Sequence, residues 1–152
     1  MPHPALLPEL EIVVCRSTGR PEAVFDLAAA QATAVQDALV YYRRVRFAGQ
    51  ALDADMVGQL RALDGLSEQA HRRGGHTSPA VFRVGVADAS ALSEAAALYV
   101  ADRDVESYQS PQERDRIALL SQLSEPLRQV AVDLRAVEVR LVDPAREPAL
   151  VC

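Results

Sequence analysis

Apolar residues recur along this chain with two different periods, and together the two periods predict a mixed fold. Two short runs, Leu10–Cys15 and Ala80–Ala87, are rich in β-branched residues and predict strands. The longer stretches between and after them keep apolar residues three or four positions apart, which predicts amphipathic helices. We therefore expect an α+β fold that is helix-dominated, with a small two- to three-stranded sheet packed against a long αα-hairpin and C-terminal helices.

The first predicted helix is the longest and runs from Pro21 to Gly49. Pro21 suits a first helical position, because its missing N–H would have no partner there. A competing interpretation ends the helix after Asp37 and makes residues 39–47 a strand. We prefer one helix, since its alanine-rich face permits close packing and Gly49 suits a C-terminal cap. On this helix we expect Tyr42 and Val45 to face the core.

A second helix follows, and the two together form the predicted αα-hairpin. Asp53 or Asp55 can cap its start, and Gly74-Gly75 closes it. Its apolar stripe comprises Met56, Leu60, Leu63, Leu66 and Ala70.

Three polar signals predict helix starts in the second half of the chain. Asp88 or Ser90 can cap an alanine-rich helix after the second strand. The sequence from Ser110 to Glu113 combines a capping box with a proline in the first turn, which predicts another start. Ser124-Glu125-Pro126 looks like a further start and predicts a kink or a split in that helix.

The chain ends are expected to be irregular. Residues 137–142 alternate strictly, and for them we prefer a closing strand over a continued helix. Residues 143–152 read as an irregular tail, and residues 1–8 carry three prolines, which suits an extended arm. No repeat, low-complexity tract or linker divides the sequence, so we expect residues 1–152 to form a single domain.

Composition and charge disfavour several classes of function for this protein. The 152 residues carry 21 acidic and 16 basic side chains, a net charge of −5, which disfavours nucleic-acid binding. No apolar run reaches the roughly 18–20 residues that cross a bilayer, and the N-terminus lacks the charge and the apolar stretch of a secretory signal. Two cysteines are too few for a disulfide scaffold. We expect a cytoplasmic protein without membrane contact and without a cofactor.

The segment Cys15–Arg20 is the first candidate for chemistry. A thiolate between a strand and a helix that starts at Pro21 would be stabilised by the helix N–H groups and by nearby arginines. The segment resembles the active-site loop of the rhodanese-like family, in which a cysteine begins a six-residue cradle that ends in arginine. The resemblance implies sulfur transfer, with Cys15 as the persulfide carrier and Arg20 as the anion clamp. The competing interpretation is a buried strand cysteine followed by a surface turn, which we prefer.

The segment His71–Ser78 is the second candidate. Arg72 and Arg73 could clamp a phosphate or carboxylate, and His76 would titrate near neutral pH, which suits anion or nucleotide binding. Basic residues before glycine are also ordinary C-terminal helix capping, and we prefer that interpretation. The spacing of His71 and His76 is not that of a helical ligand pair, so we expect no metal site.

Other clusters favour structural roles. The residues Tyr41–Phe47 mix aromatic and basic side chains as single-stranded nucleic-acid sites do, but a solvated helix end explains them better. The acidic group Asp102, Asp104 and Glu106 lacks the spacing of a calcium loop and is interpreted as a polar helix end or loop. The common hydrolase, nucleotide and metalloprotease motifs are missing. We therefore expect a non-enzymatic regulatory, interaction or structural subunit that binds a protein partner or self-associates through helical surfaces, most simply as a homo-oligomer.

Overall fold

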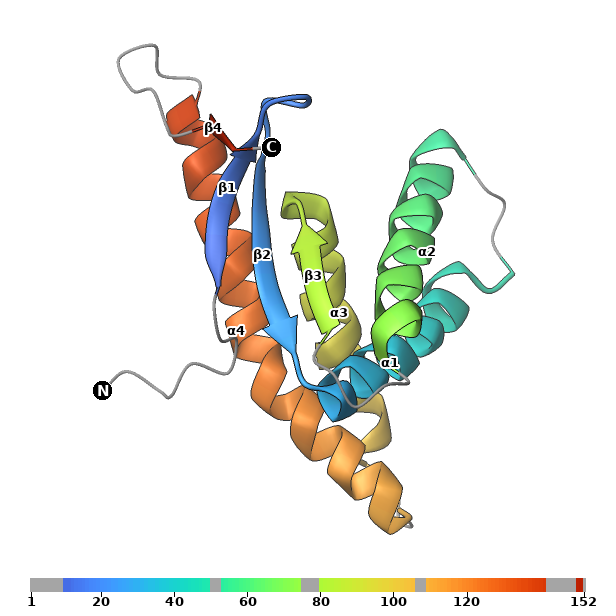
Figure 1. The fold of residues 1–152 in the computed structure, drawn as a ribbon. Coiled ribbons are helices and arrows are strands. Elements are labelled where there is room, and N and C mark those ends of the chain that lie inside the picture. The colour runs from blue at the N-terminus through green and yellow to red at the C-terminus, as the bar shows by residue number, and fades with distance from the viewer. Residues whose placement is uncertain (1–9, 50–52, 75–79, 106–108, 142–149, 152) are drawn as a thin grey trace.

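The computed structural model describes residues 10–49, 53–74, 80–105, 109–141 and 150–151. Within these ranges four strands and four helices follow one another along the chain (Figure 1). In chain order they are β1 (Glu11–Cys15), β2 (Pro21–Leu27), α1 (Ala29–Phe47), α2 (Ala54–Gly74), β3 (Ala80–Val84), α3 (Val86–Arg103), α4 (Pro111–Leu141) and β4 (Leu150–Val151).

The strands form one sheet with the order β3-β2-β1-β4. β2 is antiparallel to both of its neighbours, and β4 pairs with β1 in parallel through Val14 and Cys15. A tight turn joins β1 to β2, in which the N–H of Gly19 donates to the carbonyl of Cys15 at 2.7 Å. Gly19 has φ +69°, a left-handed conformation that glycine adopts at little cost.

The core lies between one face of the sheet and the helices. Along β2, alternate residues are buried, so Ala23, Phe25 and Leu27 all point into the core. Phe25 stacks on Phe82 of β3 with ring centroids 5.9 Å apart. In the view of Figure 1 the sheet faces the viewer, and α3 and α4 lie behind it. We call the core-facing side of the sheet the inner face and the opposite side the outer face.

Alanine-rich faces let the helices pack closely. Ala32, Ala34 and Ala38 of α1 are at most 3% exposed, and so are Ala95 and Ala96 of α3. Small side chains allow close backbone approach, so these faces are used inside the fold. The long helix α4 packs mainly against α3 and adds a stripe of leucines to the same core (Figure 1).

The fold class is therefore confirmed as a helix-dominated α+β arrangement with a small sheet, an αα-hairpin and C-terminal helices. Residues 39–47 are helical, as we preferred. Asp53 caps α2, because its carboxylate accepts the N–H of Met56 at 2.9 Å. Ser110 caps α4 by accepting the N–H of Glu113 at 3.1 Å.

The predicted helix start at Pro21 is wrong, because residues 21–27 form β2 and α1 begins only at Ala29. The residues of this segment alternate between core and outer face with the period of a strand. Pairing with both β1 and β3 outweighs the local preference of Pro21 for a helix start, since β2 holds the sheet together. At the other end of α1, Val45 is 46% exposed and does not face the core.

Three further boundaries differ from expectation. Gly85, and not Asp88 or Ser90, is the N-cap of α3. α4 continues through Pro126, so the predicted split of this helix does not occur. It extends to Leu141, so the preferred closing strand at residues 137–142 is wrong for the described part of that range. Val139 is 73% exposed, so the alternating pattern there does not mark a buried strand face.

The two ends of the chain are described only in part. The expected arm, residues 1–8, lies outside the described residues, as do residues 142–149 and 152. Within the expected irregular tail, residues 150–151 form β4 at the edge of the sheet.

Candidate functional site

The outer face of the sheet carries a diagonal row of three valines. Antiparallel partners lie on the same face, and the register pairs Val13 with Glu22, Val24 with both Glu11 and Arg83, and Val81 with Asp26. Val13 on β1, Val24 on β2 and Val81 on β3 are therefore successive diagonal neighbours. We call these three residues the valine diagonal.

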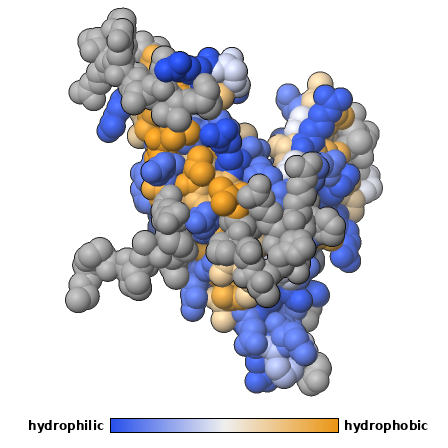
Figure 2. Space-filling view, in the orientation of Figure 1, coloured by the Kyte–Doolittle hydropathy of each residue, from blue (hydrophilic) through white to orange (hydrophobic). Residues whose placement is uncertain are grey.

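The valine diagonal lies on the face that no described helix covers (Figure 1). Val81 is 42% exposed, and Val13 and Val24 are partly exposed. By contrast, Phe25 and Phe82 on the inner face are at most 1% exposed. Figure 2, in the same orientation, shows apolar side chains among polar ones over the part of the sheet formed by β1 and β2.

Charged residues flank the valine diagonal on both sides. One flank consists of Glu11 on β1 and Asp26 on β2, and both are acidic. The other flank consists of Glu22 on β2 and Arg83 on β3. These four flanking residues carry three carboxylates and one guanidinium, and Arg20, which pairs with Cys15 at the β1–β2 turn, adds a second cation beyond Glu22.

A further carboxylate lies near the Glu22 end of this surface. Asp88, in the first turn of α3, accepts a hydrogen bond from the backbone of Gly85. Burial raises the pKa of Asp88, the Gly85 hydrogen bond opposes this rise, and the negative charge of Glu22 adds to it. Asp88 and Glu22 therefore repel each other when both are ionised, and a nearby cation would relieve that repulsion.

The exposed edge of the sheet at β3 is closed by a side chain. The carboxamide of Gln69 on α2 accepts the N–H of Arg83 at 3.0 Å and donates to the carbonyl of the same residue at 3.2 Å. A neighbouring strand would make the same pair of bonds. Gln69 therefore occupies the position at which an added strand would pair with Arg83.

The segment Cys15–Arg20 forms the turn between β1 and β2, so it does not precede a helix. The Cys15 N–H donates to the Arg20 carbonyl at 3.0 Å, and the Cys15 thiol lies 3.0 Å from the Ser17 hydroxyl. The helix N-terminus that would stabilise a thiolate here is absent, since Pro21 begins β2. The arrangement that motivated the rhodanese-like resemblance is therefore not present in this turn.

The second predicted site falls mostly outside the described residues. Residues 71–74 form the C-terminal turn of α2, as the capping interpretation expects, and His76 lies outside the described residues. Elsewhere, the described part of the chain holds no cluster of three or more residues that could bind a metal ion. No helix in the described ranges is long and apolar enough to span a membrane.

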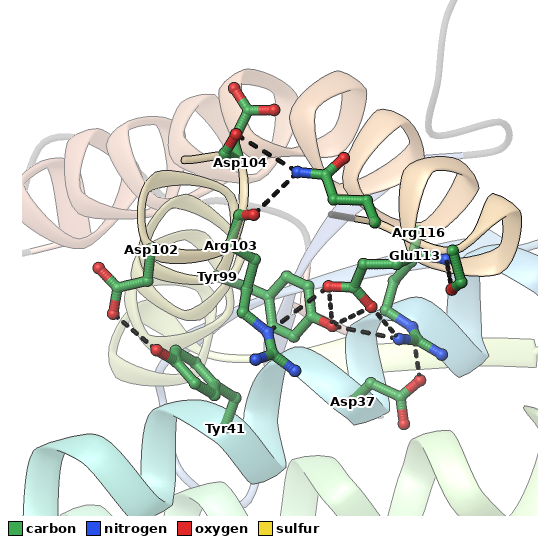
Figure 3. A network of polar contacts seen from close by, with 10 residues as sticks. Asp37, Tyr41, Tyr99, Asp102, Arg103, Asp104, Glu113 and Arg116 are labelled. Carbon is green, nitrogen blue, oxygen red and sulfur yellow. Dashed lines mark hydrogen bonds and ion pairs between the residues drawn. The ribbon is translucent and has the colours of Figure 1, made fainter. Parts of the chain in front are cut away.

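A network of polar side chains joins α1, α3 and α4 (Figure 3). The Tyr99 hydroxyl, on a side chain only 3% exposed, donates to the Glu113 carboxylate at 2.8 Å. Arg116 bonds the same carboxylate at 2.6 Å and reaches Asp37 of α1 at 2.9 Å. Burial lowers the pKa of Arg116, but its contacts with Tyr99, Asp37 and Glu113 outweigh that effect and raise it. Each charge is matched, which is typical of a structural network.

The aromatic residues of the Tyr41–Phe47 segment take part in the helix packing. Tyr41 meets Tyr99 edge-on at 5.4 Å, and its hydroxyl donates to Asp102 at 2.8 Å (Figure 3). The Arg103 guanidinium lies 5.4 Å and 5.5 Å from the centroids of these two rings. Asp102 therefore belongs to a polar helix end, as expected, while Glu106 lies outside the described residues.

A groove of about 540 Å³ lies between α1, α2 and α3. Tyr42 lines it and donates a hydrogen bond to Glu94 at 2.7 Å. Burial, together with the carboxylate of Glu94, raises the pKa of Tyr42 to about 12. A phenol with so high a pKa stays protonated at neutral pH and is a poor general base.

A scan against protein-family models and searches of curated proteins and of solved structures found no match to this chain. The geometry of its own residues therefore carries the functional argument. Sequence reasoning missed the outer face because it assigned β2 to a helix. The alternation of residues 21–27 was the signal that could have revealed it.

Proposed function

We propose that this chain is a non-enzymatic protein-binding subunit whose contact surface is the outer face of the sheet. The valine diagonal is the observation that carries the proposal. Three apolar side chains lie next to one another on three strands and are partly or fully exposed, whereas Phe25 and Phe82 on the inner face are at most 1% exposed. A contiguous apolar strip bordered by charges is typical of protein-interaction surfaces.

The shape of this surface supports a protein partner over a small molecule. Small-molecule sites are concave and enclose most of the ligand. The outer face is instead the side of a single layer of strands, and its apolar residues extend across β1, β2 and β3. A second protein chain can cover such a surface as a whole.

The location differs from the helical surfaces that the sequence pointed to. The alanine-rich faces of α1 and α3, which motivated that expectation, are buried inside the fold. The core alanines Ala32, Ala34, Ala38, Ala95 and Ala96 have almost no exposed area left to offer a partner. The sheet face is therefore the better candidate for the contact.

The test is recovery of a stoichiometric partner from the organism that encodes the protein, using an affinity-tagged chain. Val24→Asp places a charge at the centre of the valine diagonal, and Val132→Asp is the matched control on α4, where the valine is 43% exposed. We expect the partner to be lost with Val24→Asp and retained with Val132→Asp. Equal recovery with both folded variants, checked by circular dichroism, would refute the proposal.

A further inference from the structure

We infer that the partner presents an amphipathic helix to the outer face, with arginine or lysine along the side that meets Glu11 and Asp26. This inference rests on the proposed function and specifies the partner. Three features of the outer face support it: the length of the valine diagonal, the distribution of charge on its flanks, and the closed edge of β3.

The valine diagonal has the length of a short helix. Diagonal neighbours on adjacent antiparallel strands lie roughly 7–8 Å apart, so two such steps span about 15 Å from Val13 to Val81. An α-helix rises about 1.5 Å per residue, so about ten residues, or three turns, cover that distance. Apolar residues spaced three and four apart on a partner helix would form a matching stripe.

The charges on the two flanks determine which charge the partner surface must carry. Among the described strand residues, Glu11 and Asp26 form a flank that contains no cation, and a helix lying on the valine diagonal would bring its adjacent side chains over both. Basic residues at those positions would be attracted, and acidic ones would be repelled.

A second copy of this chain would match these charges less well than a basic helix. A two-fold axis along the valine diagonal would place Glu11 of one copy over Glu22 of the other, and Asp26 over Arg83. A two-fold axis across it would place Glu11 over Asp26, and Glu22 over Arg83. Each arrangement brings as many like-charged as opposite-charged pairs, whereas a basic helix meets only opposite charges on the flank of Glu11 and Asp26.

The edge of β3 argues for docking on the face. Gln69 already bonds both the N–H and the carbonyl of Arg83, so a partner strand that pairs at this residue would first have to displace it. The outer face requires no such displacement.

The probes are two fluorescein-labelled designed helices of 14 residues that share one leucine stripe. One carries arginines on a single flank of the stripe, and the other carries glutamates at the same positions. Fluorescence anisotropy measures the binding of each to the intact protein at physiological salt. We expect the arginine helix to bind at least tenfold more tightly than the glutamate helix.

A double variant with a matched control separates a defined site from general charge attraction. Glu11→Arg with Asp26→Arg reverses the acidic flank, whereas Asp115→Arg with Glu138→Arg makes the same change in net charge at exposed positions of α4. We expect the first pair to weaken binding of the arginine helix at least tenfold and the control pair to change it less than twofold.

Several outcomes would overturn the inference. They are equal weakening by both double variants, no binding of the arginine helix, or a doubled mass in light scattering that Val24→Asp abolishes. If Val24→Asp still eliminates the cellular partner while the arginine helix fails to bind, the proposed function stands and the basic helix is wrong. If Val24→Asp leaves the cellular partner bound, the proposed function itself fails.

Discussion

The side chain of Gln69 completes the hydrogen bonding of Arg83 on the outer edge of β3. One carboxamide makes two bonds, at 3.0 Å and 3.2 Å, to the backbone N–H and carbonyl of a single residue. The helix α2 thus supplies what a further strand would supply, and it does so from a residue 14 positions earlier in the chain. Unpaired strand edges promote aggregation, so this contact protects the sheet as well as fixing α2 beside it.

Gln69→Leu should destabilise the protein by about 1–2 kcal/mol, because it removes both bonds to the β3 backbone. The free energy of unfolding in urea measures the loss, and hydrogen exchange at the Arg83 amide should become faster. Gln129→Leu is the control, since Gln129 donates its side-chain hydrogen bond to Asp133 within α4 and not to a strand. A loss of stability as large in the control would contradict the role assigned to Gln69.

Arg116→Met should destabilise the protein by about 1–3 kcal/mol. The substitution removes the ion pairs with Asp37 and Glu113 and leaves the largely buried Glu113 carboxylate with fewer partners. Arg128→Met is the matched control, because Arg128 pairs with Glu125 on the same helix in full solvent. We expect the control to leave the free energy of unfolding nearly unchanged, because water screens an exposed ion pair. Thermal or urea unfolding of both variants measures the two losses of stability. A larger loss for Arg128→Met than for Arg116→Met would refute the structural role of the network.

Tyr42 should make stability depend on pH in the alkaline range. Its native pKa of about 12 lies above the ordinary value of 10.0, so the folded state holds the phenol proton more tightly than the unfolded state. The resulting stabilisation is complete below pH 10 and is lost as pH rises from 10 to 12. Two pKa units correspond to about 2–3 kcal/mol.

Urea unfolding at pH 8 and pH 11.5 tests this dependence. Relative to the unchanged protein, Tyr42→Phe should lose less stability over that interval. Glu94→Gln should lower the pKa of Tyr42, because the Glu94 carboxylate contributes to raising it. Identical pH profiles for Tyr42→Phe and the unchanged protein would refute the assignment.

Two glycine-to-alanine substitutions should change the stability of the protein in opposite directions. Gly19→Ala forces alanine into φ +69° in the β1–β2 turn and should cost about 1 kcal/mol. Gly58 lies inside α2 with open space where a methyl group would be, so Gly58→Ala should stabilise by about 0.5–1 kcal/mol. Melting temperatures of the two variants provide the comparison. A shift in the same direction for both would show that one of the two backbone conformations is misassigned.

The sequence predicted an element correctly where that element is stabilised by interactions between residues close together in the chain. Asp53 and Ser110 cap helices in the structure as their positions predict, and the strand signals at residues 10–15 and 80–87 mark β1 and β3, although β3 ends at Val84 and α3 begins at Val86. Periodicity also revealed the αα-hairpin, because α1 buries one stripe of apolar residues and α2 buries Leu63 and Leu66.

The wrong predictions concern segments whose structure is decided by contacts with residues far away in the chain. Residues 21–27 contain a proline, acidic residues and alanine, which suit a helix start, yet their hydrogen-bond partners are β1 and β3, the latter more than 50 residues away. Residues 137–141 alternate like a strand but continue α4. The candidate surface depended on the first of these segments, so it could not be recognised before the register of the sheet was known.

Photo-crosslinking from the centre of the outer face tests the central claim most directly. A benzoylphenylalanine replaces Val24 in one strain of the encoding organism and Val139, an exposed valine on α4, in another. After irradiation we predict one discrete adduct from position 24, heavier than the chain by the mass of a different protein, and no such adduct from position 139. The absence of an adduct at position 24, or the same adduct from both positions, would contradict the account.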